Sequence, residues 1–351
     1  MRRLVCRSFG TRDGIAVEDA PTPAPGRGEV LIRITAANVA FVDRLIVRGG
    51  YQVRPPVPFT PGAVGAGEVV EVGSGVGHLH PGTRVVVLKS DYGTWATHIV
   101  APARSVVQIP SGLDDTVAAA SIEAYGTASY ALEDRGRLRA GETVLVLGAG
   151  GAVGHAAVET AVHLDARVVT VTSDPEFWAA APVRPALVLD RRVTHLREAM
   201  KLRFPAGVDV VLDPVGGEMA EAALRSLGFG GRYLVVGFAS GDIPRLPANH
   251  VLLRNRSVVG VEWASWITEN PDNLARTIEV VLNRLARGML HPPRPHLVAL
   301  DHLPDVLLAA PPESGLVRTV VIPAGSAHSD AAGDGAVERS STRPVRLAAA
   351  T

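Results

Sequence analysis

Four glycines lie within seven residues near the middle of the chain: Gly148, Gly150, Gly151 and Gly154. An apolar, β-branched run at 144–147 precedes them, and apolar residues at helical spacing follow from 157 to 164. Glycine lets a backbone turn tightly and approach a ligand without Cβ atoms in the way. The N–H groups at the start of the following helix then attract negative charge. This spacing predicts a glycine loop that binds the pyrophosphate of a dinucleotide.

A second buried run, Val168–Val171, closes this unit as strand, helix and strand. The residue at the end of the second strand selects the cofactor, because an acidic side chain there binds the ribose hydroxyls of NAD and repels the 2′-phosphate of NADP. This chain has the neutral pair Thr172 and Ser173, followed by Asp174. The sequence therefore predicts NADP, bound as NADPH, with NAD as the alternative cofactor.

The elements on either side of this unit differ in kind. Short alternating runs separated by Gly and Pro turns occupy residues 1–110 and predict a partly closed β-barrel. These strands are expected at 30–34, 67–72, 84–88 and 95–100. After the glycine loop, strand and helix patterns alternate, which predicts a doubly wound parallel sheet. The further strands are expected at 186–189, 208–212, 232–236, 257–261 and 316–322, with a helix at 273–287.

The composition excludes several classes of protein. The 351 residues include 35 basic and 35 acidic side chains, so no net charge attracts nucleic acid or an anionic membrane. No apolar run approaches the length of a membrane span, and no apolar segment follows the N-terminal arginines as in a signal peptide. Cys6 is the single cysteine, which leaves no intrachain disulfide and no multi-cysteine zinc site. We expect a cytoplasmic protein without nucleic-acid or membrane partners.

Several segments together resemble the zinc-free quinone oxidoreductase branch of the medium-chain dehydrogenase/reductase superfamily. The similarity covers residues 3–323 and is most specific at the glycine loop, Tyr51–Gly62, Tyr125–Leu132, Asp213–Gly217 and Gly231–Val261. It implies an α/β protein with a GroES-like β-barrel catalytic domain around an inserted Rossmann dinucleotide-binding domain. The expected limits are 1–122 and 265–323 for the barrel domain, 123–264 for the Rossmann domain and 324–351 for a disordered tail.

The resemblance also implies a homodimer that uses NAD(P)H to reduce a small-molecule quinone or a carbon–carbon double bond conjugated to a carbonyl. The cofactor contacts that it implies lie on the glycine loop and at strand ends, where ligands collect in open α/β sheets. They are Thr127, Gly150, Gly151, Ala152, Val153, Ser173, Val215, Gly237, Phe238 and Ala239. Thr172, at the end of the second strand, is a further predicted cofactor contact. Arg191 replaces a family tyrosine and is expected either to supply a cation near the ribose or to be an exposed residue without a role. Arg318 stands where a lysine close to the cofactor is common.

Three other positions depart from the family pattern. Phe177 replaces a lysine that contacts the 2′-phosphate, which weakens the prediction of NADP. Ala40 replaces an asparagine, although Asn38 is close by, and Val64 replaces a glutamate. The changes at 40 and 64 remove polar groups near the expected nicotinamide pocket.

Zinc-dependent members of the superfamily hold the metal with cysteine, histidine and a carboxylate. This chain has no cysteine at the pocket and has Val64 at the glutamate position, while His78 and His80 lie in a turn rich in Gly and Pro. We therefore expect no metal, and hydride transfer supported by positioning and hydrogen bonds.

Tyr51 is the first candidate for a catalytic group. Its phenol can donate a hydrogen bond to a substrate carbonyl oxygen as negative charge develops there, although packing in a loop is the alternative role. Asp43 and Arg48 precede it, and they either orient the site or form a structural ion pair. Water is the alternative source of the proton.

Two alternatives to a quinone or enone reductase stay open. One is a reductase of an enoyl thioester or of a biosynthetic enone, which uses the same hydride chemistry. The other is a non-catalytic dinucleotide-binding relative, to which the losses at positions 40, 64 and 177 point.

Overall fold

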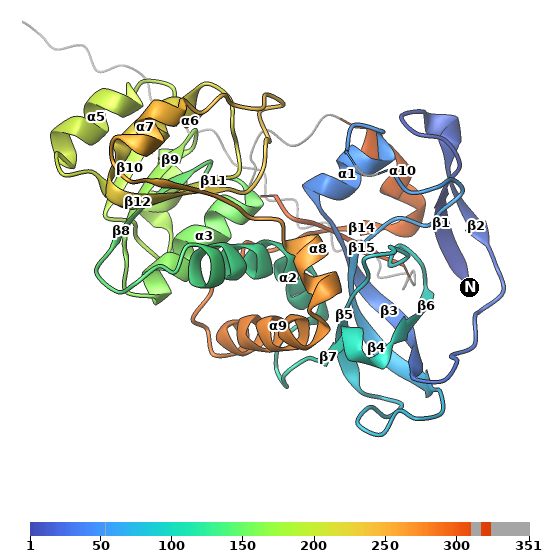
Figure 1. Cartoon of the computed structure of the whole chain (residues 1–351). Helices are drawn as coiled ribbons and strands as arrows, with labels where there is room; N and C mark the ends of the chain where they lie inside the picture. Colours follow the sequence, from blue (N-terminus) through green and yellow to red (C-terminus); the bar gives the residue numbers. More distant parts are fainter. Residues whose placement is uncertain (53, 310–316, 324–351) are drawn as a thin grey trace, which may run out of the picture.

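The computed structural model of the chain describes residues 1–52, 54–309 and 317–323 (Figure 1). The predicted disordered tail, 324–351, lies outside these residues. Two large sheets form two lobes, which are joined by helices. A separate two-stranded ribbon pairs β1 (Arg2–Cys6) antiparallel with β2 (Ile15–Asp19). The two lobes match the two parts that the sequence patterns predict.

The first lobe contains a six-stranded sheet with strand order β10-β9-β8-β11-β12-β13, in which every neighbouring pair is parallel. Its strands are β8 (Thr143–Leu147), β9 (Arg167–Thr172), β10 (Leu187–Asp190), β11 (Val208–Asp213), β12 (Leu227–Val235) and β13 (Ser257–Gly260). The chain direction across the sheet reverses between β8 and β11. Open α/β sheets bind ligands beyond the carboxyl ends of the strands at such a point.

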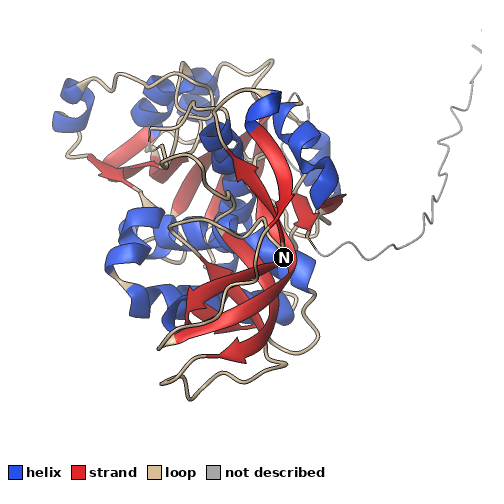
Figure 2. Ribbon diagram, turned by 90° about the vertical axis from the view of Figure 1, so that its right-hand side faces the viewer, coloured by secondary structure: helices blue, strands red, loops and turns tan. Residues whose placement is uncertain are grey.

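Helices cover both faces of this parallel sheet (Figure 2). Val144 and Val146 of β8 contribute to a core shared with α3, whereas Leu145 and Leu147 contribute to a core shared with α5 and α6. This division follows from the two-residue period of a strand. The helices of this lobe are α3 (Ala152–His163), α4 (Pro175–Ala180), α5 (Leu196–Arg203), α6 (Met219–Ser226) and α7 (Ala248–Leu252). The predicted doubly wound sheet is confirmed.

The second lobe contains a seven-stranded sheet in which the order β14-β15-β3-β4-β5-β7 is supplemented by β6 paired to β3. Its strands are β3 (Glu29–Val39), β4 (Val64–Val72), β5 (Arg84–Leu88), β6 (His98–Pro102), β7 (Val106–Gln108), β14 (His296–Ala299) and β15 (Thr319–Ile322). β15 runs antiparallel to β3, with Val320 opposite Asn38. The C-terminal strands therefore complete a sheet that is built mainly from the first 110 residues.

The predicted strand at 95–100 is wrong in its first half, because β6 begins at His98. Trp95 is fully buried in the preceding loop, and its Nε1 donates to the carbonyl oxygen of Asn38 at 2.8 Å. Its own backbone pairs with Leu4 and Pro61 at 2.9 and 3.1 Å, rather than with β3. Burial of the indole ring, with an acceptor for its N–H inside the protein, therefore takes the place of regular strand pairing at Trp95.

Helix α2 (Asp115–Ser129) connects the two lobes. It begins at the N-cap Asp114, whose carboxylate accepts from the backbone N–H of Thr116 at 2.8 Å. The helix packs on β3 and β4 of the second lobe and on α3 of the first. The expected domain limit between residues 122 and 123 falls inside this helix, so the two proposed domains share it.

The remaining helical segments lie beside the second lobe or between the lobes. They are η1 (Arg12–Gly14), α1 (Phe41–Val47), η2 (Ala103–Ser105), η3 (Tyr130–Arg135), α8 (Trp263–Glu269), α9 (Pro271–Ala286), η4 (Leu300–His302) and α10 (Leu303–Leu308). Among the residues that the structure describes, every helix is too short or too polar to cross a lipid bilayer.

Replacing the buried indole tests the core of the second lobe. We expect Trp95→Ala to lower the free energy of unfolding by about 3–5 kcal/mol, because it leaves a cavity and an unpaired carbonyl. Trp95→Phe should cost less, since most of the volume is kept. Denaturant titration measures both changes, with Phe229→Ala as the control because Phe229 is 72% exposed. Equal effects at positions 95 and 229 would contradict the packing described here.

Candidate functional site

The glycine loop brings the start of α3 against the end of β8. Gly148 has a φ of +60°, and a Cβ atom added to Gly154 would lie 2.2 Å from the carbonyl oxygen of Gly148. Gly151 is the N-cap of α3, followed by Ala152 and Val153 in its first turn. The first N–H groups of a helix have no acceptor within the helix and carry its positive dipole end. The start of α3 therefore has backbone donors that an anionic ligand could use, and the pyrophosphate contacts stay a prediction.

The end of β9 lies beside this loop. A Cβ atom on Gly150 would lie 3.2 Å from Oγ1 of Thr172, which accepts from the N–H of Asp174 at 3.0 Å. The carbonyl oxygen of Thr172 accepts from the N–H of Arg191 at 2.9 Å. Ser173 and Arg191 are exposed, whereas Thr172 is buried. Four of the residues predicted to bind cofactor thus gather at one edge of the sheet.

The charges around Arg191 distinguish it from its neighbour. Arg192 forms an ion pair with Asp190 at 2.7 Å, which lowers the pKa of that carboxyl through a side-chain hydrogen bond. Within the described residues, no carboxylate lies within ion-pair distance of Arg191. Its guanidinium is therefore available to an anionic ligand at the end of β9.

Phe177, which replaces the family lysine, has a packing role. Its N–H donates to the carboxylate of Asp174, the N-cap of α4, at 3.2 Å. Its ring lies 5.5 Å from that of His155 and 5.1 Å from that of Trp178. The aromatic side chain thus extends a cluster beside α3 instead of offering a cation.

The loops after β11 and β12 close the other side of the site. A Cβ atom on Gly148 would lie 2.5 Å from Val215, so these two residues are in contact. One carboxylate oxygen of Asp213 accepts from the N–H groups of Val215 and Gly216, both at 2.8 Å. The N–H of Ala239 donates to the carbonyl oxygen of Pro214 at 3.1 Å. Gly237, Phe238 and Ala239 therefore lie next to the glycine loop through the loop at 214–216.

Two predicted contacts come from outside the parallel sheet. Thr127 is half-buried on α2, near Tyr125, whose hydroxyl donates to the buried carboxylate of Glu159 at 2.6 Å. Arg318 is buried just before β15, and this burial lowers its pKa to about 10. The electrostatic interaction between Arg318 and Tyr125 places Arg318 beside the start of the Tyr125–Leu132 segment.

A second polar group lies where β3 passes into α1. Asp43 is 1% exposed; one of its carboxylate oxygens accepts from the N–H of Ala40 at 2.9 Å, and the other has no partner among the described residues. Glu123 of α2 accepts from the side-chain amide of Asn38 at 3.3 Å. Burial raises the pKa of both carboxyls into the neutral range, and the charge of Asp43 raises that of Glu123 further.

Two tyrosines belong to the same group. Burial raises the pKa of Tyr51, and the charges of Glu262 and Glu123 raise it further. Burial also raises the pKa of Tyr92, with further contributions from Asp43 and Tyr51. Phenols whose ionisation is suppressed in this way stay protonated and can donate hydrogen bonds.

The expected alternative for Asp43, an ion pair with Arg48, is not found in the described residues. The guanidinium of Arg48 instead donates to the carbonyl oxygens of Leu307 and Ala309, at 2.8 and 2.6 Å. The end of α10 therefore holds Arg48 away from the buried carboxylate. Asp43 and Tyr51 both act on Tyr92, whose pKa their charges raise, and the catalytic roles of the two residues stay predictions.

Comparison with known proteins agrees with this architecture. Residues 26–111 match the alcohol dehydrogenase GroES-like domain, and residues 152–280 match the zinc-binding dehydrogenase domain. The mouse quinone oxidoreductase-like protein 2 is 34% identical over 294 residues, which cover 83% of each chain. The chain belongs to the quinone oxidoreductase branch of the medium-chain dehydrogenase/reductase superfamily. The family resemblance found in the sequence is thereby confirmed, as is the fold class.

Solved structures agree with this assignment. A probable oxidoreductase from Mycobacterium abscessus is 32% identical with a TM-score of 0.76, over 92% of this chain and 99% of that chain. A putative NADPH:quinone reductase from Bacillus thuringiensis is 25% identical with a TM-score of 0.83, over 92% and 98%. This chain is accordingly a member of an oxidoreductase family.

Glu123 is a polar residue beside Asp43 that the sequence patterns did not reveal. It lies in the apolar segment Val117–Ala124, where a single acid on one helix turn gives no periodic signal. The one signal in the sequence is its residue type, because an ionisable side chain in an otherwise apolar helical segment needs a partner or a function.

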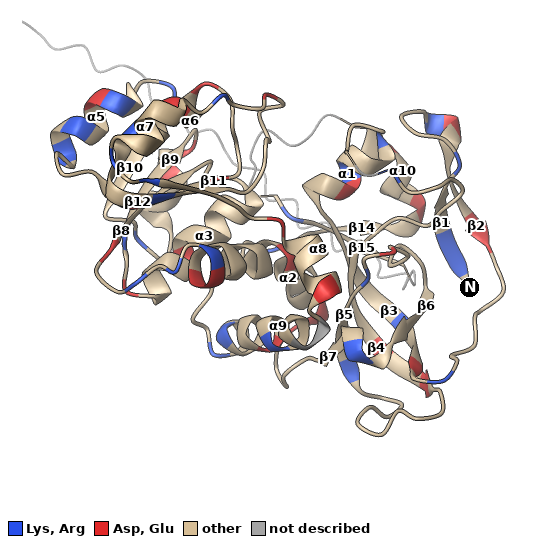
Figure 3. Cartoon of the chain, viewed as in Figure 1, with Lys and Arg blue, Asp and Glu red and all other residues tan. Residues whose placement is uncertain are grey.

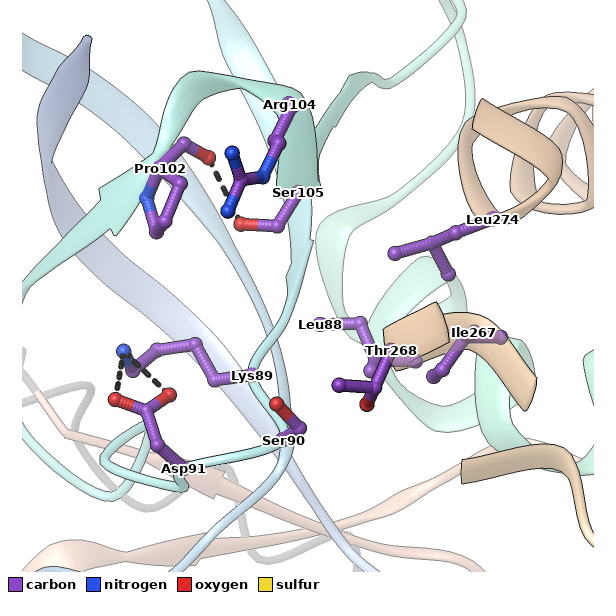
Figure 4. Close-up of a pocket in the computed structure, with 10 residues that line it drawn as sticks. All are labelled: Leu88, Lys89, Ser90, Asp91, Pro102, Arg104, Ser105, Ile267, Thr268 and Leu274. Carbon is purple, nitrogen blue, oxygen red and sulfur yellow. Dashed lines mark hydrogen bonds and ion pairs between the residues drawn. The ribbon is translucent and has the colours of Figure 1, made fainter. Parts of the chain in front are cut away.

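The described residues contain no group of three His, Cys, Asp or Glu side chains that could hold a metal ion. They do contain a cavity of ≈ 130 Å³ between the end of β5 and helix α8 (Figure 4). Lys89 and Asp91 form an ion pair at its edge, at 2.9 Å, and Ser105 donates to the carbonyl oxygen of Pro102 at 2.8 Å. None of the predicted site residues lines this cavity, so the glycine loop and the Asp43 group define the candidate site.

The close approach at the glycine loop can be tested by adding one methyl group. Gly154→Ala would place Cβ against the backbone of Gly148 and displace α3, so we expect dinucleotide affinity to fall by about tenfold or more. Gly77→Ala is the matched control, because a Cβ atom at Gly77 meets nothing within 4 Å. Fluorescence titration measures both. Unchanged affinity in Gly154→Ala would show that the loop does not bind the dinucleotide.

Proposed function

We propose that the chain is a zinc-independent reductase that transfers hydride from NADPH to a quinone or an α,β-unsaturated carbonyl compound. The observation that carries this proposal is the cradle at the carboxyl end of the parallel sheet, where the glycine loop meets Thr172. Because Gly154 has no Cβ atom, α3 begins directly over the carbonyl oxygen of Gly148, and the first N–H groups of the helix could then reach a bound pyrophosphate. The relative from Bacillus thuringiensis, named as a putative NADPH:quinone reductase, supports the same assignment.

The residues that would hold NADPH divide by position. Gly150, Ala152 and Val153 would bind the pyrophosphate through backbone N–H groups. Gly151 would let the backbone approach closely, since its own N–H donates to the carbonyl oxygen of Gly148 at 2.9 Å. Thr172, Ser173 and Arg191 would bind the 2′-phosphate, where Arg191 does what the lost lysine at 177 does in relatives. The nicotinamide half would lie along Val215, the loop at 237–239 and Thr127, with Arg318 nearby. When bound, the cofactor supplies the hydride that reduces the substrate.

The Asp43 group would supply the proton that accompanies the hydride. Negative charge develops on the substrate oxygen, and the phenol of Tyr51 would donate a hydrogen bond to it. Asp43 is buried and Glu123 is half-buried, and the charge of Asp43 raises the pKa of Glu123, so the two acids would not ionise together near neutral pH and Glu123 would keep a proton to donate. Glu123 would thereby replace the polar groups lost at 40 and 64.

The homodimer and the cytoplasmic location stay predictions.

Cofactor selection tests the role of Arg191. We expect NADPH to bind about tenfold more tightly than NADH, and Arg191→Ala to abolish this difference by weakening NADPH alone. Arg192→Ala is the control, because Arg192 is paired with Asp190. Quenching of tryptophan fluorescence measures each affinity. Equal affinity of the unchanged chain for NADPH and NADH would contradict selectivity for NADPH. Absence of binding to either cofactor would contradict the assignment as a reductase.

The pH dependence tests the proton held by Glu123. The raised pKa keeps Glu123 protonated below neutral pH, so we expect kcat to fall as the pH rises through the neutral range. Glu123→Gln should lower kcat by about tenfold to hundredfold and remove this alkaline loss. Glu71→Gln, at an exposed position of β4, should change neither. An unaltered pH profile in Glu123→Gln would exclude Glu123 as the acid.

The same titration affects stability, with a sign that can be worked out. Because the folded pKa of Glu123 lies above its ordinary value of 4.5, its contribution to stability is complete below pH 4.5 and is lost as the pH rises through neutrality. Glu123→Gln should flatten this part of the pH–stability curve.

Turnover of an enoyl thioester alone would instead identify the substrate as a thioester, and binding of NADPH without any turnover would identify a non-catalytic relative.

A further inference from the structure

A second cavity, of ≈ 350 Å³, lies at the opposite end of the parallel sheet from the glycine loop. Gly207 and Leu227, which line it, lie at the amino ends of β11 and β12, whereas the glycine loop follows the carboxyl end of β8. Its volume falls within the range of small-molecule sites in proteins. We call it the basic cavity, for the six residues Arg197, Lys201, Arg225, His250, Arg254 and Arg256 that line it.

The charge of the basic cavity is compensated only in part. None of the residues that line it carries a carboxylate, although the whole chain has as many acids as bases. Glu221, just outside, pairs with Arg225 at 3.1 Å. For the part of the chain that the structure describes, Arg197, Lys201 and Arg254 have no carboxylate within ion-pair distance. Figure 3 shows the basic segments on α5 at this end of the lobe.

One cation in the cavity is fixed by the fold. Arg256 is 9% exposed, and its guanidinium donates to the carbonyl oxygens of His250 and Arg225, both at 3.2 Å, and to that of Leu227. Burial lowers its pKa, and the nearby charges of Arg254 and Arg225 lower it further. The guanidinium groups of Arg225, Arg254 and Arg256 therefore repel one another, and the hydrogen bonds of Arg256 to backbone carbonyls keep it from moving away. A bound anion would relieve this repulsion.

We propose that the basic cavity binds a phosphorylated small molecule that has an apolar part. Guanidinium groups match phosphate oxygens in geometry and charge, and several of them favour a ligand with more than one phosphate charge. Met200, Phe204 and Leu253 line the rest of the cavity and provide apolar walls. The site is separate from the one proposed for NADPH and does not depend on that proposal.

Tripolyphosphate is the probe that tests this site. We would titrate it into the full chain by calorimetry at constant ionic strength, with and without saturating NADPH, so that the glycine loop is occupied in one series. The expected result is one tripolyphosphate per chain in both series. The double variant Arg197→Ala/Lys201→Ala should weaken this binding by about tenfold or more, because it removes two charge-assisted hydrogen-bonding groups.

Arg203→Ala is the matched control, since Arg203 lies exposed on the same helix and does not line the cavity. It should leave the affinity for tripolyphosphate unchanged, and circular dichroism should show that every variant is folded. Equal weakening in both variants, binding that NADPH abolishes, or no binding at all would each overturn the proposal. Binding of an acidic peptide in preference to tripolyphosphate would also overturn it, because the partner would then be a protein.

Discussion

The closeness of α3 to the end of β8 is the constraint on which the candidate site depends. With no Cβ at Gly154, the helix begins directly over the carbonyl of Gly148. The neighbouring strands then converge on the same point, because Gly150 touches Thr172 of β9 and Gly148 touches Val215 after β11. One backbone contact thus sets the positions of the loop donors, the end of β9 and the loop after β11. A side chain at Gly154 would separate all three.

The Asp43 group shows the opposite kind of constraint, a polar group that the fold holds at a cost. Arg44 follows Asp43 directly, yet its guanidinium donates to the carbonyl oxygen of Val306 at 2.6 Å, and that of Arg48 donates to Leu307. Their guanidinium donors hold α10 against α1 instead of neutralising the buried carboxylate. Burying an uncompensated acid lowers stability. The N–H of Ala40 at the start of α1 offsets part of this cost for Asp43, whereas the nearby charge of Glu123 adds to it, and the proposed proton transfer would give the pair a function.

Local patterns predicted the elements that depend on local rules. The glycine loop between β8 and α3 follows from glycine spacing between two apolar runs, and β9 to β13 follow from short apolar segments. Contacts that depend on tertiary placement were beyond such patterns. Trp95 has the residue type of a strand but finds its acceptor, Asn38, across the sheet. Glu123 lies far from Asp43 in sequence, and only the packing of α2 on β3 brings the two acids into each other's field.

The polarity of the parallel sheet helps to separate two explanations for the basic cavity. Helices α5 and α6 end near it, and cations in their last turns, Lys201 and Arg225, are favoured there by the helix dipoles alone. Arg256 likewise caps the end of α6 through the carbonyl of Arg225. Arg197 does not fit this explanation, since it lies near the start of α5, where the dipole disfavours a cation. Arg254 belongs to no helix. Arg197 and Arg254 are therefore the cations that the helix dipoles do not explain, and their presence favours a bound anion.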